Sequence, residues 1–142
     1  MFRALDDTIM VAPQIGTDAV AAALAQGVRL IINNRPEGES EDQTPGADIE
    51  AAARAAGMDY VAIPVTHSGF SEAQVKAMAD ALDTAKGPVL AYCRSGTRST
   101  LLWALAEAST GEHPAVLAEK AAAAGYDLAP VATLMDILRA KA

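Results

Sequence analysis

The sequence predicts an α/β fold with three layers, in which a mostly parallel central sheet of about 4–5 strands is flanked by helices. Two observations predict it. Short apolar runs rich in β-branched residues alternate along the chain with longer segments of helical pattern. Apolar residues make up 51% of the chain and aromatic residues only 4%, as expected for alanine-rich helices around a small aliphatic sheet. With 142 residues, the chain is expected to form one domain, 1–142.

The first half of the chain carries three of the expected strands and two helices. Each helix is expected to end at a glycine, which can adopt the left-handed conformation that closes a helix. Thr17 is the expected N-cap of the first helix. The polar stretch 34–45 is expected to be a long loop. The expected strands are 8–11, 28–33 and 60–63, and the expected helices are 18–26 and 48–56.

The second half contains a fourth strand and four helical segments. The spacing of Ser71 and Gln74 predicts a capping box that opens a helix to about residue 85. The segment that begins at Ser99 is apolar on every side, so we expect a helix buried in the middle of the domain. The expected strand is 89–92, and the two remaining helices are 114–124 and 130–141.

The only cysteine, Cys93, lies in a short polar loop between the strand 89–92 and the buried helix. Backbone N–H groups of such a loop and of the first helical turn have no intrahelical acceptor, so they point at whatever lies above the thiol. The helix dipole and Arg98 both favour negative charge there, and Gly96 lets the backbone bend. These surroundings favour a thiolate that faces an anion.

Loops at the carboxyl ends of parallel strands meet at one edge of the sheet, where ligands bind. The loops 33–43, 66–70 and 93–98 are therefore expected to surround one crevice. We interpret Cys93 and Arg98 as the catalytic residues. The candidate anion-binding residues are Arg94, Ser95, Gly96, Thr97 and Ser99, and further candidates in the neighbouring loops are Asn34, Arg35 and His67.

Simpler interpretations of these side chains stay open. Cys93 could be a buried structural thiol, and Ser99 could cap the buried helix, bond to the thiolate, or do both. Arg94 is expected to face solvent or substrate rather than the inside of the loop.

Simpler interpretations also stay open for residues of the two neighbouring loops. Arg35 and Glu37 could form an exposed ion pair, although their place at the crevice makes a binding role about as consistent. The acidic run 39–42 could be a solvated loop that repels anions, and His67 could be ordinary polar surface.

Composition excludes several classes of function. The net charge of −7 argues against nucleic acid and against an anionic membrane surface as partners. The chain shows no signal core and no run long enough to span a membrane, so we expect a cytoplasmic protein. A single cysteine excludes an internal disulfide and a cysteine-based zinc site, and the two histidines are too few and too far apart for a metal centre. No metal and no cofactor are expected.

Four motifs carry a likeness to a known family: Gln14 after the first strand, I-I-N-N-R-P-E-G-E at 31–39, I-P-V at 63–65 and G-P-V-L-A-Y-C-R-S-G-T-R-S at 87–99. Together they resemble the phosphatase-like domain of beta-lactamase hydrolase-like proteins, a small bacterial family also labelled sulfur transferases. Within the last motif, C-R-S-G-T-R-S at 93–99 looks like the persulfide loop of rhodanese-type sulfurtransferases.

The resemblance implies the fold of dual-specificity cysteine phosphatases, and a functional link to a protein of the metallo-hydrolase or persulfide dioxygenase type. The sequence departs from the phosphatase pattern in two places. Four residues separate Cys93 from Arg98, one fewer than in those enzymes. The stretch 65–70, which corresponds to the loop where they carry an aspartate as general acid, contains no aspartate.

The hypothesis we favour is that the protein is a cysteine-dependent sulfurtransferase that carries sulfane sulfur as a Cys93 persulfide. The loop amides and Arg98 would bind the anionic donor, thiosulfate or a low-molecular-weight persulfide. Sulfite or a thiolate leaves without being protonated, whereas phosphoester cleavage gains ~10²–10⁴-fold from a positioned acid. A site without an obvious acid therefore suits sulfur transfer.

Two alternatives stay open. The first is a cysteine-dependent phosphatase that forms a phosphocysteine intermediate from a phosphoester, with His67, Glu37 or Glu72 as substitute acid. The second is a non-catalytic module that binds an anion or a partner through the same loop.

Overall fold

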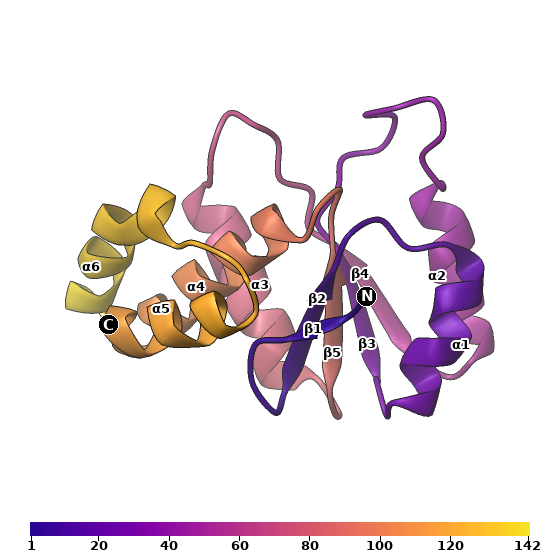
Figure 1. The fold of residues 1–142 in the computed structure, drawn as a ribbon, viewed down its shortest axis with the longest axis horizontal. Helices are drawn as coiled ribbons and strands as arrows, with labels where there is room; N and C mark the ends of the chain where they lie inside the picture. Colours follow the sequence, from indigo (N-terminus) through magenta and orange to yellow (C-terminus); the bar gives the residue numbers. More distant parts are fainter.

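The computed structural model describes residues 1–142 and contains a five-stranded sheet with helices on both faces (Figure 1). The strands are β1 (Arg3–Ala4), β2 (Ile9–Ala12), β3 (Leu30–Asn33), β4 (Asp59–Ala62) and β5 (Val89–Tyr92). Their order is β1-β2-β5-β3-β4, and all neighbours are parallel except β1 and β2. The predicted fold class is confirmed, and the strand that leads to Cys93 is the central one.

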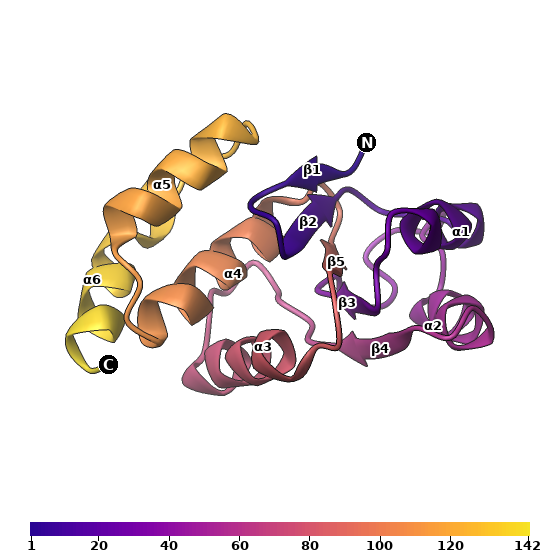
Figure 2. The ribbon, with the colours of Figure 1, turned by 90° about the horizontal axis from the view of Figure 1, so that it is seen from below.

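The helices form the two outer layers. They are α1 (Thr17–Ala25), α2 (Gly46–Ala55), α3 (Glu72–Thr84), α4 (Thr97–Ser109), α5 (Pro114–Ala123) and α6 (Ala132–Ala140), the last preceded by a 3₁₀ turn at Ala129–Val131. Figure 2 shows α1 and α2 on one face of the sheet and α3 and α4 on the other, with α5 and α6 packed outside α4. None of these helices is long and apolar enough to cross a lipid bilayer.

The predicted boundaries lie within two residues of the observed ones, and the differences have local causes. The N-cap of α1 is Gly16, not Thr17, which is already helical. The helix α2 begins at Gly46, two residues earlier than predicted. A carboxylate of Glu37 accepts a hydrogen bond from the Gly46 amide at 2.9 Å, and so satisfies a free N–H group of the first turn. No pattern predicts β1, because two residues are too few to show alternation.

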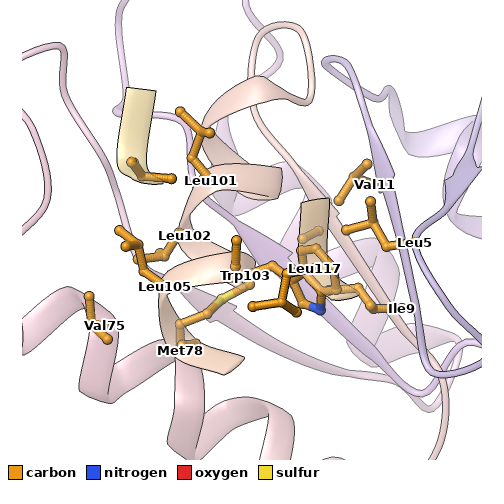
Figure 3. Packing of buried hydrophobic residues seen from close by; sticks show 14 of the residues in the cluster. Leu5, Ile9, Val11, Val75, Met78, Leu101, Leu102, Trp103, Leu105 and Leu117 are labelled. Carbon is orange, nitrogen blue, oxygen red and sulfur yellow. The ribbon is translucent and has the colours of Figure 1, made fainter. Parts of the chain in front are cut away.

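The helix α4 is the centre of the larger hydrophobic core, as its apolar sides predict. All its residues from 99 to 106 are buried. Leu102, Trp103 and Leu105 are at most 1% exposed, and Figure 3 shows them among side chains of α3 and β2. A second cluster packs α1 and α2 against the other face of the sheet. Because α4 is packed on all sides, the loop that precedes it has a fixed anchor.

Leu105→Ala should lower the free energy of unfolding by about 2–5 kcal/mol, because it leaves a cavity in this packed region. Leu24→Ala is the matched control, since Leu24 is 44% exposed on α1 and its loss should change stability by less than about 0.5 kcal/mol. Urea unfolding followed by circular dichroism measures both. Equal losses for the two variants would contradict the buried position of α4.

Candidate active site

Three loops meet at the carboxyl edge of the sheet. In Figure 1, the loops that follow β3 and β4 rise from the edge at which β5 ends. Backbone hydrogen bonds join their bases: Asn34 N–H donates to Tyr92 O at 2.8 Å, and Val65 N–H donates to Asn34 O at 2.9 Å. The Asn34 side chain is fully buried and donates to Ile63 O at 2.9 Å. Asn34 therefore holds the loops together and does not reach the crevice.

The loop from Cys93 to Gly96 curls around the thiol. Gly96 N–H donates to Cys93 Sγ at 3.1 Å. The backbone of Gly96 has a φ of 90°, which lies in the left-handed region that disfavours a β-carbon. A β-carbon there would also collide with the hydroxyl of Tyr126, which donates to Ser95 O at 3.2 Å. Only glycine fits this turn without displacing its neighbours.

Unpaired amides surround this loop. The backbone N–H groups of Arg94, Ser95, Arg98 and Ser99 make no hydrogen bond within the chain. The helix α4 begins at Thr97, so the positive end of its dipole lies at the same place. Free amides and a helix N-terminus together can bind an anion.

Arg98 is held beside the thiol by a carboxylate. Its two terminal nitrogens donate to the two oxygens of Glu39 at 2.7 and 2.8 Å, and one of them also donates to Val65 O at 2.7 Å. The hydrogen bonds to Glu39 raise the pKa of the Arg98 guanidinium above its ordinary value, and the nearby Cys93 sulfur adds to the rise. Cys93 itself is fully buried.

Glu39 also accepts a hydrogen bond from Arg35 Nε at 3.0 Å. Its side chain is only 17% exposed, so the interpretation of 39–42 as a solvated run is wrong at this residue. The hydrogen bonds from Arg98, together with that from Arg35, lower the pKa of Glu39 to about 2. Glu39 is therefore ionised at neutral pH and joins Arg35 of its own loop to Arg98 in the first turn of α4.

Arg35 does not form the exposed ion pair with Glu37 that the sequence allows. It is buried, with 4% of its surface exposed, and its terminal nitrogens donate to Gln14 Oε1 at 3.0 Å and to Ser40 Oγ at 3.2 Å. Glu37 instead accepts from the Gly46 amide. Arg35 thus connects the loop after β2 to the loop after β3.

Ser99 has neither of the roles considered from the sequence. It is fully buried and its hydroxyl has no hydrogen-bond partner, and the N-cap of α4 is Gly96. Arg94, Ser95 and Thr97 are exposed.

A cavity of about 410 Å³ lies between the Cys93 loop and the loop after β4. It brings His67 together with Arg94 and Arg98, whereas Asn34 and Arg35 are not among its lining residues. No lining residue is acidic, and no group of three His, Cys, Asp or Glu side chains in the molecule could hold a metal ion. The cavity is lined by Thr66, His67, Gly69, Phe70, Arg94, Ser95, Thr97, Arg98 and Leu101.

Residues 1–110 match the family model of the beta-lactamase hydrolase-like protein, phosphatase-like domain. The chain belongs to this family. A beta-lactamase hydrolase-like protein of Xylella fastidiosa (strain 9a5c) is 37% identical over 134 residues, which are 93% of this chain and 31% of that protein. One of Agrobacterium fabrum is 45% identical over 87 residues, 61% of this chain and 20% of that protein. The chain spans less than a third of the length of these relatives.

Solved structures share the fold of this chain. A protein of Neisseria meningitidis described as a candidate phosphatase has a TM-score of 0.84 and 32% identity, covering 96% of this chain and 97% of its own. PTPMT1 has a TM-score of 0.75 at 16% identity, covering 99% of this chain and 98% of its own. P. aeruginosa TpbA has a TM-score of 0.69 at 20% identity, covering 98% of this chain and 88% of its own. The chain is therefore a phosphatase-like domain with the cysteine-phosphatase fold.

Glu39→Gln should lower the free energy of unfolding at pH 7 by about 2–3 kcal/mol, because it removes the charge that Arg35 and Arg98 share. The folded-state pKa of about 2 lies below the ordinary value of 4.5. The contribution is therefore complete above about pH 4.5 and is lost as the pH falls toward 2. Urea unfolding at several pH values measures it.

Glu41→Gln is the matched control, since Glu41 is exposed in the same loop and makes no hydrogen bond. It should change stability by less than about 0.5 kcal/mol. If the gap between wild type and Glu39→Gln stayed the same at pH 7 and pH 2.5, the charge of Glu39 would not be what stabilises the loops.

Proposed function

We propose that this chain is a sulfurtransferase that carries sulfane sulfur on Cys93 as a persulfide. The observation that supports it is the absence of a proton-donating carboxyl group at the site. The cavity beside the loop has no acidic lining residue, and the carboxylate bound to Arg98 belongs to Glu39, whose pKa is about 2. A bond from the Ser40 hydroxyl likewise holds the pKa of the nearby Asp42 below its ordinary value.

The reaction needs no such group. The Cys93 thiolate would attack the outer sulfur of thiosulfate, and a new S–S bond would form as the S–S bond of the donor breaks. The electron pair leaves with sulfite, which needs no proton. An acceptor thiolate then attacks the outer sulfur of the persulfide and releases Cys93 as thiolate. The free amides of Arg94, Ser95, Arg98 and Ser99 would bind the anion in both steps.

Thiosulfate should add one sulfur atom, about 32 Da, to the wild-type protein and none to Cys93→Ser, as expected for a covalent intermediate on the nucleophile. Intact-mass spectrometry of unreduced protein measures it, and treatment with a thiol should remove the added mass. The proposal fails if neither thiosulfate nor an organic persulfide modifies Cys93.

A phosphatase that works through a phosphocysteine is the second candidate, and the comparisons favour it more directly than sulfur transfer. The Neisseria protein described as a candidate phosphatase covers nearly the whole chain, and a cysteine-to-serine variant of TpbA has been solved in complex with phosphotyrosine. In this chain the acid would be His67, since it is the one cavity residue, besides the two arginines, that carries a titratable side chain.

If this candidate is correct, the protein should hydrolyse an aryl phosphate, and His67→Asn should lower kcat about 10²-fold or more, as expected for a lost general acid. His113→Asn is the control, because His113 lies outside the cavity at the start of α5. The rate of phosphate release, measured for both variants, decides whether His67 acts as the general acid. Equal rates for wild type and Cys93→Ser would exclude the phosphatase. Absence of both sulfur loading and phosphate release would leave the binding module.

The partner follows from the length of the relatives. The matched region is only 31% of the Xylella protein, so in that protein the domain is joined to further polypeptide. We propose that the present chain passes its sulfur to a protein of the type that forms the remainder of such relatives, and that both act in the cytoplasm.

A further inference from the structure

The carbonyl group of Ser95, in the middle of the loop around the thiol, has a single hydrogen-bond donor within the chain. The Tyr126 hydroxyl donates to Ser95 O at 3.2 Å, and no backbone amide bonds to this oxygen. The next carbonyl, that of Gly96, is instead held from within α4, by the amide of Thr100 at 3.0 Å and by its hydroxyl at 2.8 Å. The direction of the Ser95 carbonyl therefore depends on Tyr126.

The same peptide unit carries the N–H group that faces the thiol. Ser95 C=O and Gly96 N–H belong to one trans peptide, which is planar, so the two groups point in opposite directions. Gly96 N–H donates to Cys93 Sγ at 3.1 Å. Tyr126 on one side of the peptide thus fixes the hydrogen bond that reaches the sulfur on the other side. If the peptide rotated, its carbonyl oxygen would face the sulfur and repel a thiolate.

The glycine in this peptide does not hold it in place by itself. The φ of Gly96 is 90°, but glycine adopts positive and negative φ about equally well. A rotated peptide is therefore open to the backbone at this position. The Tyr126 hydroxyl lies directly against Gly96, where a β-carbon would collide with it. The contact with the tyrosine, rather than the preference of the glycine, selects the observed direction.

Tyr126 is itself held from two sides. Its ring packs against the main hydrophobic core, and the Arg3 guanidinium lies 5.6 Å from the ring centroid while Arg3 Nη1 donates to Ala124 O at 3.0 Å. Burial raises the pKa of the Tyr126 hydroxyl above its ordinary value, the charge of Arg3 opposes the rise, and the Cys93 sulfur adds to it. The hydroxyl therefore keeps its proton at neutral pH and acts as a donor.

We propose that Tyr126 is a positioning residue for the Cys93 thiolate, because its hydroxyl holds the peptide between Ser95 and Gly96 with the N–H group toward the sulfur. An amide that donates to the sulfur stabilises the thiolate over the thiol. Tyr126 follows α5 and lies beyond residues 1–110, which match the family model. The inference goes beyond the proposed function, since sulfur transfer and phosphoester cleavage both begin with the thiolate.

Tyr126→Phe tests this role because it removes only the hydroxyl group. Cys93 is the only cysteine, so the ultraviolet absorbance of the thiolate, followed against pH, reports on this sulfur alone. The same variant with Cys93→Ser supplies the background from the tyrosines. The pH midpoint of thiolate formation should rise by about one unit in Tyr126→Phe, which is a tenfold change in the ionisation equilibrium.

Tyr60→Phe is the matched control. Tyr60 is also half-buried, and its hydroxyl accepts a hydrogen bond from Asn33 Nδ2 at 3.0 Å but makes none with the Cys93 loop. Both variants should lower the free energy of unfolding in urea, because each loses one hydrogen bond. Only Tyr126→Phe should move the midpoint. Arg98, the cation beside the sulfur, is present in both, so a difference between them reports on the peptide.

The rate at which thiosulfate modifies Cys93 gives a second measurement. Below the midpoint, Tyr126→Phe should react about tenfold more slowly than the wild type, since a smaller fraction of its sulfur is thiolate. Well above the midpoint, the two rates should be equal. A loop that is merely displaced would instead react slowly at every pH.

Each outcome has a separate meaning. A midpoint that moves no further in Tyr126→Phe than in Tyr60→Phe overturns the positioning role, even if the variant is less stable. A loss of rate that is the same at every pH also overturns it. If thiosulfate does not modify the wild type, the result counts against the sulfurtransferase alone, and the absorbance titration still decides the role of Tyr126.

Discussion

The site depends on one carboxylate that accepts hydrogen bonds from two arginines. Glu39 holds Arg98 from the first turn of α4 and Arg35 from its own loop. Arg35 in turn contacts Gln14 after β2, and Arg98 contacts Val65 after β4. Four segments that are far apart in the sequence therefore converge on a single negative charge. These hydrogen bonds stabilise the fold because both arginines are largely buried, and a buried guanidinium without a partner lowers the free energy of unfolding.

The second constraint comes from below the site. The helix α4 is buried from Ser99 to Ala106, and its first residue follows the turn that Gly96 makes around the cysteine sulfur. The position of this helix is set by packing, which is dense and tolerates little displacement. Packing thus fixes one end of the cysteine loop, and the Glu39 bridge fixes the side chain of Arg98 above it. Neither constraint alone would place both the thiol and the guanidinium.

Patterns with a short range predicted most of the fold. The parallel sheet, the buried α4 and the loop around Cys93 each depend on residues that are close in sequence. Hydrophobic periodicity and the positions of glycines were therefore sufficient to predict them. The role of Glu39 was out of reach for the same reason: its partner Arg98 is 59 residues away, and in the sequence Glu39 is one acidic residue among several. The burial of Arg35 depends on Gln14, 21 residues before it. The unbonded hydroxyl of Ser99 likewise follows from packing rather than from any local motif.

The fold and the chemistry of this chain are separate questions. Cysteine phosphatases and persulfide carriers both need a thiolate, free amides and an arginine, so a shared fold supports either reaction. They differ in what the leaving group requires: an alkoxide needs a proton, whereas sulfite and a thiolate do not. In this chain the carboxylate that binds Arg98 is that of Glu39, and its role is structural. The hydrogen bonds that hold Glu39 to the arginines also lower its pKa and keep it ionised. A carboxyl group cannot both hold two arginines and donate a proton at neutral pH. If the protein is a phosphatase, it therefore takes its proton from a different kind of group, and His67 is the residue whose position allows it.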